Sequence, residues 1–255
     1  MTVRIPPSTD ILAGRAKVAV VVPATNTIVQ PEMEAMRPPG VTNHVTRMLL
    51  PPRPYDDMAV YRKALETEKG HLEEALDMVL PCAPHVVAHG HSIHSFRGDR
   101  ARADSEQQRL QDYCGIPFVT PSIAVLKGLE AIGNPKRIAI LTPYWPPADA
   151  LIAEFFTACG YEVVGAHGLK AIGPTAVAQI PLETIRGAFR ELDSPRVEAL
   201  IHVGTNLPVS AITGQIEEAH GKPLIGVNVA TYWLALRSIG IADRVPGFGR
   251  LLAEH

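Results

Sequence analysis

The sequence predicts an α/β protein built from two similar subdomains, each a parallel sheet flanked by helices, related by a pseudo-twofold. Two observations predict this. Short apolar runs alternate with helical patterns along the chain, and one strand-and-helix segment occurs twice. The copies span residues 115–124 and 221–230, and each runs from Gly-X-Pro through an apolar run into a helix that closes in Ile-Gly. Such self-similarity is typical of a chain with two halves of like topology.

The individual elements follow from their patterns. Continuous apolar runs predict buried strands at residues 17–22, 43–49, 86–88, 137–141, 161–165 and 197–203. Amphipathic spacing predicts helices at residues 28–36, 56–80, 98–113, 147–158 and 181–192. Alternating strands and helices imply parallel sheets with right-handed crossovers. We expect residues 1–120 with 226–255 to form the first lobe and residues 121–225 the second, with the active site between them. A single doubly wound sheet is the alternative, and the repeat disfavours it.

Composition excludes several classes of partner. The chain has 255 residues, of which 46% are hydrophobic, enough for one large core or two smaller ones. The chain has 24 basic and 26 acidic residues and a net charge of -2. This balance does not indicate binding to nucleic acid or to a membrane surface, so we expect a small molecule as the ligand. No apolar run approaches the roughly 20 residues of a membrane span. This composition is also compatible with a homo-oligomer.

The cysteines indicate the compartment. Three cysteines stand without CxxC spacing, and the first 16 residues lack the apolar core of a signal peptide. Both features predict a reducing environment, and we expect a cytoplasmic protein.

Four loops that each follow a predicted strand are the candidate site. They are residues 23–27, 90–95, 142–144 and 204–206. In parallel sheets ligands collect at the carboxyl ends of strands. Gly90 allows the backbone to turn or to approach a ligand, and His91 follows it. An imidazole with a pKa of about 6.5 is the usual carrier of a proton in catalysis, so we expect His91 to be catalytic.

The same loops supply donors for a substrate carboxylate. The candidates are Thr25, Asn26, Ser92, Gly204, Thr205 and Asn206, with Tyr144 as a second catalytic group. A purely structural role is the alternative for several of these residues. Helix capping or an Asx turn would equally explain Asn26, Thr205 and Asn206, and a position at the rim of the site would explain Tyr144. Arg47, Arg53 and Arg97 are further candidates for carboxylate binding, although exposed arginines are more often only solvated. The proline-rich loop at residues 51–54 is long enough to cover a site.

These loops, read in order, resemble the aspartate/glutamate racemase superfamily, specifically its maleate isomerase and arylmalonate decarboxylase branch. The similarity lies in Pro-Ala-Thr-Asn-Thr at residues 23–27, Gly-His-Ser at 90–92, Thr-Pro-Tyr at 142–144 and Gly-Thr-Asn-Leu at 204–207. It extends over about residues 17–240, including the closing helix at 227–237. The resemblance implies a two-subdomain enzyme without a cofactor, acting on small carboxylic acids held between the halves.

The chain departs from that family at its cysteines. The resemblance implies one cysteine in each half, and here His91 and Gly204 occupy those places. Arylmalonate decarboxylases keep only the second cysteine. Without either thiol, the covalent isomerase route and two-base racemisation cannot proceed as in the relatives. Cys82, Cys114 and Cys159 do not follow strands, so we expect them to be structural.

One-sided proton transfer by His91 suits a lyase or decarboxylase better than a racemase. Our leading prediction is a cofactor-independent lyase of the decarboxylase type acting on a small carboxylate-bearing substrate. The first alternative is a maleate-type cis-trans isomerase with His91 in place of the nucleophilic cysteine. A metal-dependent hydrolase or lyase using His89, His91 and His94 is the second, and a non-catalytic binding relative is the third.

Overall fold

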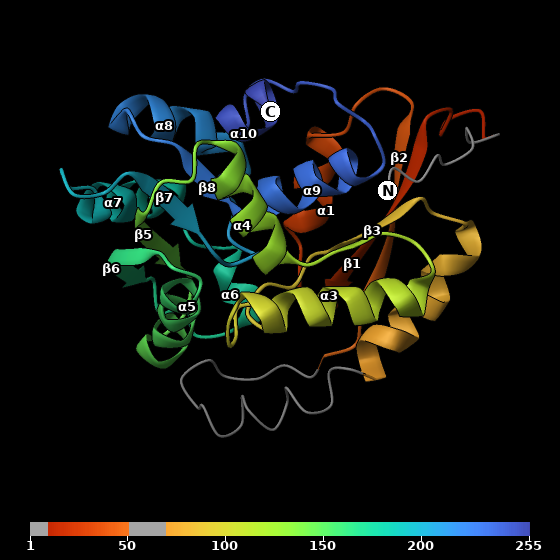
Figure 1. The fold of residues 1–255 in the computed structure, drawn as a ribbon, viewed down its shortest axis with the longest axis horizontal. Helices are drawn as coiled ribbons and strands as arrows, with labels where there is room; N and C mark the ends of the chain where they lie inside the picture. Colours follow the sequence, from red (N-terminus) through yellow and green to blue (C-terminus); the bar gives the residue numbers. More distant parts are fainter. Residues whose placement is uncertain (1–9, 51–69) are drawn as a thin grey trace.

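Two four-stranded parallel sheets form the framework of the chain (Figure 1). The computed structural model describes residues 10–50 and 70–255. The first sheet has the order β2-β1-β3-β4 and contains β1 (Ala16–Pro23), β2 (Val41–Met48), β3 (Val86–His89) and β4 (Phe118–Val119). The second has the order β6-β5-β7-β8 and contains β5 (Arg137–Thr142), β6 (Glu162–Gly168), β7 (Ala199–His202) and β8 (Leu224–Gly226). The two orders are the same, which confirms the prediction of two similar α/β subdomains.

Helices cover both faces of these sheets. They are α1 (Val29–Ala35), α3 (Arg100–Cys114), α4 (Pro121–Ala131), α5 (Pro146–Ala158), α6 (Pro174–Val177), α7 (Leu182–Leu192), α8 (Thr213–His220), α9 (Val227–Ser238) and α10 (Arg250–Glu254). Residues 70–79 are also helical. The rest of the predicted helix at 56–80, the loop at 51–54 and Arg53 lie outside the described residues. Within the described ranges no helix is both long and apolar enough to cross a membrane.

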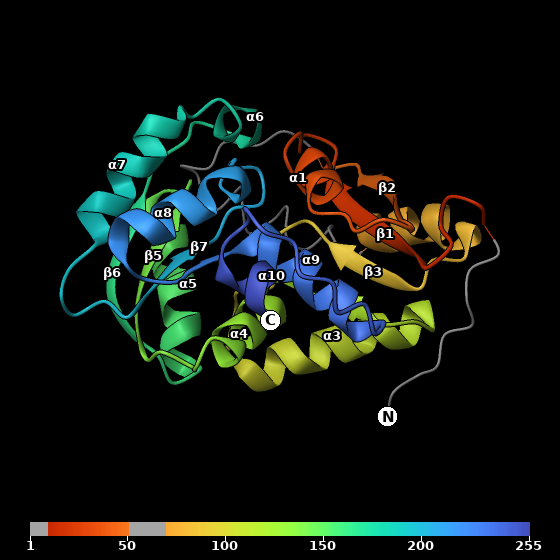
Figure 2. The same ribbon diagram turned by 90° about the horizontal axis from the view of Figure 1, so that it is seen from above.

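The sequence repeat corresponds to the centre of the molecule. Its first copy forms β4 and α4, and its second forms β8 and α9. The two repeated helices pack against each other, and α9 lies between the sheets in both views (Figures 1 and 2). One apolar cluster therefore includes Val20 of β1, Ile140 of β5 and Tyr232 of α9. The two halves share a core, which fixes how their strand ends face each other.

Alternation along the strands builds two outer clusters as well. In β1, Val18, Val20 and Val22 face the shared core, whereas Ala19 and Val21 face a second cluster on the other side of the sheet. A third cluster covers the outer face of the second sheet. Strands buried on both faces read as continuous apolar runs, which is why the sequence predicted them well.

Candidate active site

The loop after β1 reaches across to the second sheet through Asn26. Its side-chain oxygen accepts the backbone N–H groups of Ile28 at 3.0 Å and Val29 at 2.9 Å, an Asx turn that starts α1. Its amide nitrogen donates to Thr205 Oγ1 at 3.3 Å. Arg47 donates to the Asn26 carbonyl at 2.8 Å and holds the loop from behind. Asn26 thus serves both as a turn residue and as a link between the halves.

Asn206 forms a second link, and both ends of its amide are engaged. Its oxygen accepts the Thr27 N–H at 2.9 Å, and its nitrogen donates to the Pro174 carbonyl at 2.9 Å. The Thr25 carbonyl lies 3.5 Å from the same nitrogen. Because the amide is fully occupied, this side chain positions the loops around it.

Ser92 and Tyr144 form the third link between the halves. Their hydroxyl oxygens lie 3.1 Å apart, and the Thr205 N–H donates to Ser92 Oγ at 3.4 Å. Two hydroxyls carry two protons, and the bond between them uses one. The pair thus places two hydroxyl groups side by side where the two halves meet.

Tyr144 is held firmly rather than standing at a rim. It is only 5% exposed. Its N–H donates to Thr142 Oγ1 at 3.0 Å, and its carbonyl accepts the Lys170 N–H at 3.0 Å. The Thr142 hydroxyl in turn donates to Asp149, a carboxyl whose pKa is raised by burial. The turn after β5 therefore presents the phenol in one orientation.

His91 follows a tight packing position. A side chain at Gly90 would place its Cβ 2.8 Å from Val22 Cγ1 and 2.9 Å from Val29 Cγ1, so only glycine fits there. His91 is 9% exposed, and its ring centroid lies 4.8 Å from that of His94. The imidazole is thus buried and directly precedes Ser92, which contacts both Tyr144 and Thr205.

Among the described residues, His89, His91 and His94 are not grouped as the ligands of a metal ion. His89 faces the other side of the sheet, where its ring packs 5.7 Å from Phe118. Its ring centroid lies 6.1 Å from that of His91, and the two planes are inclined at 82°. In the described part of the chain no group of three His, Cys, Asp or Glu side chains is arranged to hold a metal ion. The alternative of a three-histidine metal enzyme is therefore not supported by the structure.

Gly204, in the second half, occupies a position where a side chain does not fit. Its φ is +153°, and a Cβ built there would lie 2.3 Å from Pro143 Cδ. His202, two residues earlier on β7, is 1% exposed, and burial lowers its pKa to about 3. Its ring is therefore neutral at ordinary pH and lies behind the loop.

A buried carboxylate that the sequence analysis missed supports the Thr205 loop. Glu32 on α1 accepts the Ser210 N–H at 2.9 Å, the Ser210 hydroxyl at 2.6 Å and the Asn228 amide at 2.7 Å. The same Asn228 nitrogen donates to the Thr205 carbonyl at 2.9 Å. Burial raises the pKa of Glu32, and the bonds from Ser210 and Asn228 act in the opposite direction. Nothing in the spacing of these residues along the sequence joins them.

A model of the arylmalonate decarboxylase family matches residues 65–252. The chain belongs to the arylmalonate decarboxylase family. This result confirms the predicted place in the maleate isomerase and arylmalonate decarboxylase branch of the racemase superfamily, and with it an enzyme of the lyase or isomerase kind.

Relatives from both parts of the branch are similar to this family member. The maleate isomerase of Nocardia farcinica is 27% identical over 94% of this chain and 97% of its own length. The arylmalonate decarboxylase of Bordetella bronchiseptica is 29% identical over 65% of this chain and 69% of its own length. A structure of the Nocardia farcinica maleate cis-trans isomerase with a covalently bound succinylcysteine intermediate has a TM-score of 0.84, at 23% identity and coverage of 94% and 99% of the two chains.

All three cysteines of this arylmalonate decarboxylase family member lie at the edge of the sheets opposite the candidate active site. Cys82 ends a turn before β3, Cys114 ends α3 before β4, and Cys159 follows α5 before β6. These are the amino-terminal ends of the strands. Burial also raises the pKa of all three thiols, that of Cys114 to about 11, so none is a ready thiolate.

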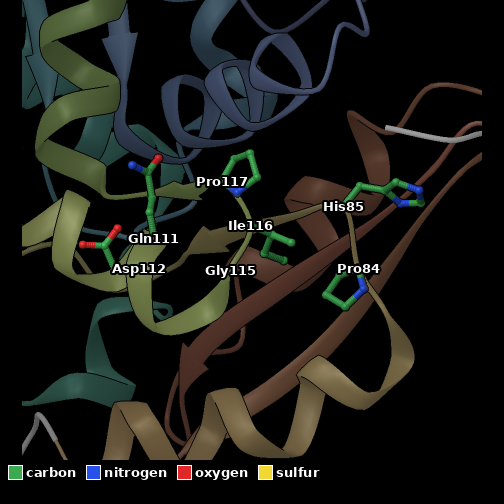
Figure 3. A pocket seen from close by; sticks show the side chains of 7 residues that line it. All are labelled: Pro84, His85, Gln111, Asp112, Gly115, Ile116 and Pro117. Carbon is green, nitrogen blue, oxygen red and sulfur yellow. The ribbon is translucent and has the colours of Figure 1, made fainter. Parts of the chain in front are cut away.

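A groove of about 590 Å³ also lies at this amino-terminal edge (Figure 3). It is lined by His85 and Pro117 at the starts of β3 and β4 and by Gln111 and Asp112 of α3. The His85 ring is already engaged, because its Nδ1 accepts the Lys17 N–H at 2.9 Å. Since the candidate loops lie at the carboxyl ends of the strands, this groove is separate from the active site.

Proposed function

We propose that this chain is a cofactor-independent lyase of the decarboxylase type, in which His91 transfers a proton to a small carboxylate-bearing substrate. The family and its relatives support decarboxylase or isomerase chemistry on small carboxylates. The observation that carries the choice is the position of His91. It is a buried imidazole beside the Ser92–Tyr144 link between the halves, in a chain whose thiols lie at the opposite edge.

Decarboxylation needs an acid at one face of the substrate and hydrogen-bond donors around the remaining carboxylate. The bond between the α-carbon and the leaving carboxylate breaks, CO₂ departs, and the electron pair spreads onto the other carboxylate as an enediolate. Protonated His91 then delivers its proton to the α-carbon and is left neutral. One acid at one face is enough for this step.

The developing negative charge requires donors that are already in place. The Ser92–Tyr144 pair supplies hydroxyl groups at the link between the halves. Thr205 Oγ1 accepts from Asn26, and within the described residues its own proton has no acceptor. We assign anion binding to these groups, together with the backbone at Thr25. Gly204 and Asn206 shape the loop that holds them.

A cis-trans isomerase with His91 as nucleophile is the second candidate. It is favoured by the similarity to a maleate isomerase over nearly the full length of both proteins. In that route an imidazole nitrogen adds to the double bond, the new single bond rotates, and the nitrogen leaves. An intermediate covalently attached to His91 distinguishes it from decarboxylation.

The deciding experiment compares His91→Ala with a matched control, His167→Ala. His167 is a half-buried histidine on β6, in the second half of the molecule. CO₂ release from an arylmalonate and conversion of maleate to fumarate are measured for each variant without added cofactor. We expect the first activity in the parent and a loss of about 10²–10⁴-fold in His91→Ala only, because general acid catalysis contributes about that much. Iodoacetamide should leave the parent rate unchanged.

Three results contradict the proposal in different ways. Retained activity in His91→Ala removes the assignment of this residue. Fumarate formation with a trapped adduct on His91, found by peptide mass spectrometry, favours the isomerase. Calorimetric binding of both substrates without turnover indicates a non-catalytic relative. The cytoplasmic location and any homo-oligomer remain predictions.

A further inference from the structure

A separate cavity lies behind the histidine loop, on the face of the first sheet opposite the shared core. Its volume is about 170 Å³, several times the roughly 30 Å³ that one water occupies in the liquid. Its lining includes buried Leu110 and His89, exposed Arg97 and Arg102, and the Arg109–Glu106 ion pair. His94 lines it from the loop. Among the described residues that line the cavity, arginines thus outnumber carboxylates by three to one.

The arginines near this cavity fall into two kinds. Arg100 pairs with Asp104 at 3.0 Å and Glu130 at 2.9 Å, and Arg109 pairs with carboxylates of Glu106 and Glu73. Arg97 and Arg102 differ. Among the described residues neither has a carboxylate within ion-pair distance, so their charges are not compensated there.

The segment that carries Arg97 and Arg102 is also held in shape. Arg102 donates from Nη1 to the Arg97 carbonyl at 3.0 Å, and its N–H is capped by Asp99 at 2.9 Å. Gly98 has a φ of +69°, and a Cβ there would lie 2.7 Å from Arg102 Cδ, so the arginine side chain lies directly across the glycine. A guanidinium fixed in this way loses little side-chain entropy when it binds an anion.

We propose that this cavity binds a small, doubly charged oxyanion, either inorganic phosphate or the phosphoryl group of a small organic phosphate. Two uncompensated guanidinium groups suit such an anion, because their planar N–H forks match its oxygens. The volume of about 170 Å³ restricts the ligand to a compact group.

The cavity and the active site share one loop. Ser92 faces Tyr144 and Thr205 on one side, whereas His94 and Ser95 line the cavity on the other. The ring of His94 lies 4.8 Å from that of His91. An anion in the cavity therefore sits one imidazole away from the proposed acid, and its binding should be detectable at both rings.

The test is a titration of the full chain with inorganic phosphate, followed by calorimetry and by NMR of ¹³C-labelled histidine. Phenyl phosphate is titrated in parallel, and the tighter of the two ligands identifies the source of the anion. We expect the His94 and His91 resonances to shift with saturation. We also expect Arg97→Ala and Arg102→Ala each to weaken binding about 10-fold or more, as the loss of a charge-assisted hydrogen bond does.

Arg100→Ala is the matched control, because it removes the same charge from the same segment at a carboxylate-paired position. It should change the affinity less than twofold. Absence of binding by both ligands overturns the proposal. So does an equal loss in all three variants, which indicates unspecific attraction to a basic surface. Because binding is measured without turnover, neither result depends on the proposed reaction. Circular dichroism verifies that each variant is folded.

Discussion

The loops after β3 and after β7 occupy the same place in two halves of like topology, yet they carry different chemistry. The first contains Gly90, which packs against Val22 and Val29, and then a buried imidazole at His91. The second contains Gly204, where a side chain would collide with Pro143. The histidine nearest to it in the sequence, His202, is buried behind the loop, and burial keeps its ring neutral. The fold is repeated, but the set of reactive groups is not.

This difference indicates that the local structure of the second loop requires glycine at position 204. The loop therefore does not result simply from the replacement of a cysteine. Glycine adopts a φ of +153° without strain, and the ring of Pro143 occupies the space of a side chain. We propose that the first loop contributes an acid and that the second contributes N–H and O–H donors.

The largest effect is expected for Gly204→Cys, which introduces the cysteine that the resemblance implies at this position. A Cβ 2.3 Å from Pro143 Cδ forces the backbone to move, and the φ is unfavourable for any residue but glycine. Overpacking costs about 1–3 kcal/mol and an unfavourable φ about 1–2 kcal/mol, so we expect a loss of about 2–5 kcal/mol in the free energy of unfolding. Urea denaturation measures it.

Gly160→Ala is the control for backbone strain alone. Gly160 has a φ of +82°, and nothing lies within 4 Å of a Cβ built there. It should cost about 1 kcal/mol. If Gly204→Cys is as stable as the parent and gains racemase activity, the second loop does not require glycine at this position. The proposed difference between the two loops is then wrong.

The second prediction concerns the hydroxyl pair that joins the two loops. Ser92→Ala and Tyr144→Phe each remove one of two oxygens 3.1 Å apart. Each alone should lower kcat by about 10-fold or less, because the remaining hydroxyl still carries a proton but loses the partner that orients it. The double variant leaves no hydroxyl at this place, so its loss should reach about 10²- to 10³-fold. A double variant no worse than either single one would show that the remaining hydroxyl donates nothing.

The sequence predicted the fold well because the fold depends on local patterns. Strands buried on both faces are continuous apolar runs, and the repeat at residues 115 and 221 revealed the two halves directly. Helices α6, α8 and α10 were not predicted. They are short, with four, eight and five residues, so no long apolar period marks them.

The candidate site was predicted only in part, because some of its properties depend on contacts between distant segments. The loop positions of Asn26, Ser92, Tyr144 and Thr205 came from strand ends, and the structure brings these residues together. The full engagement of the Asn206 amide could not be predicted, since Thr27 and Pro174 are its partners. A packing collision is equally invisible in a sequence.

The third prediction tests the support of the second loop from the first half. Glu32→Gln replaces a carboxylate that accepts three hydrogen bonds with an amide whose nitrogen faces a donor. We expect a loss of about 1.5–3 kcal/mol in the free energy of unfolding, typical of a broken hydrogen bond to a charged group. A several-fold decrease in kcat should follow, because Asn228 also binds the Thr205 carbonyl.

Glu34→Gln is the matched control on the same helix. Glu34 pairs with Arg37 at the surface, and such pairs contribute little. Its loss should change stability by less than about 0.5 kcal/mol. Equal effects at the two positions would show that Glu32 does not specifically hold the loop.

At neutral pH the smallest effect is expected at His202, and it should grow as the pH is lowered. Its pKa is about 3 in the folded chain because of burial, against 6.5 for an exposed imidazole. Between these values the unfolded chain binds a proton that the folded chain does not, so stability must fall as the pH is lowered from about 6.5 towards 3. The slope from this one group is at most about 1.4 kcal/mol per pH unit.

His202→Asn removes the titration and should flatten the profile of unfolding free energy between pH 6.5 and 4. His167→Asn, at a half-buried position on β6, should leave the slope in place. If His202→Asn leaves it in place as well, the His202 ring is reached by solvent or by a proton donor. The second loop then holds a titratable group after all, and one-sided proton transfer loses its structural basis.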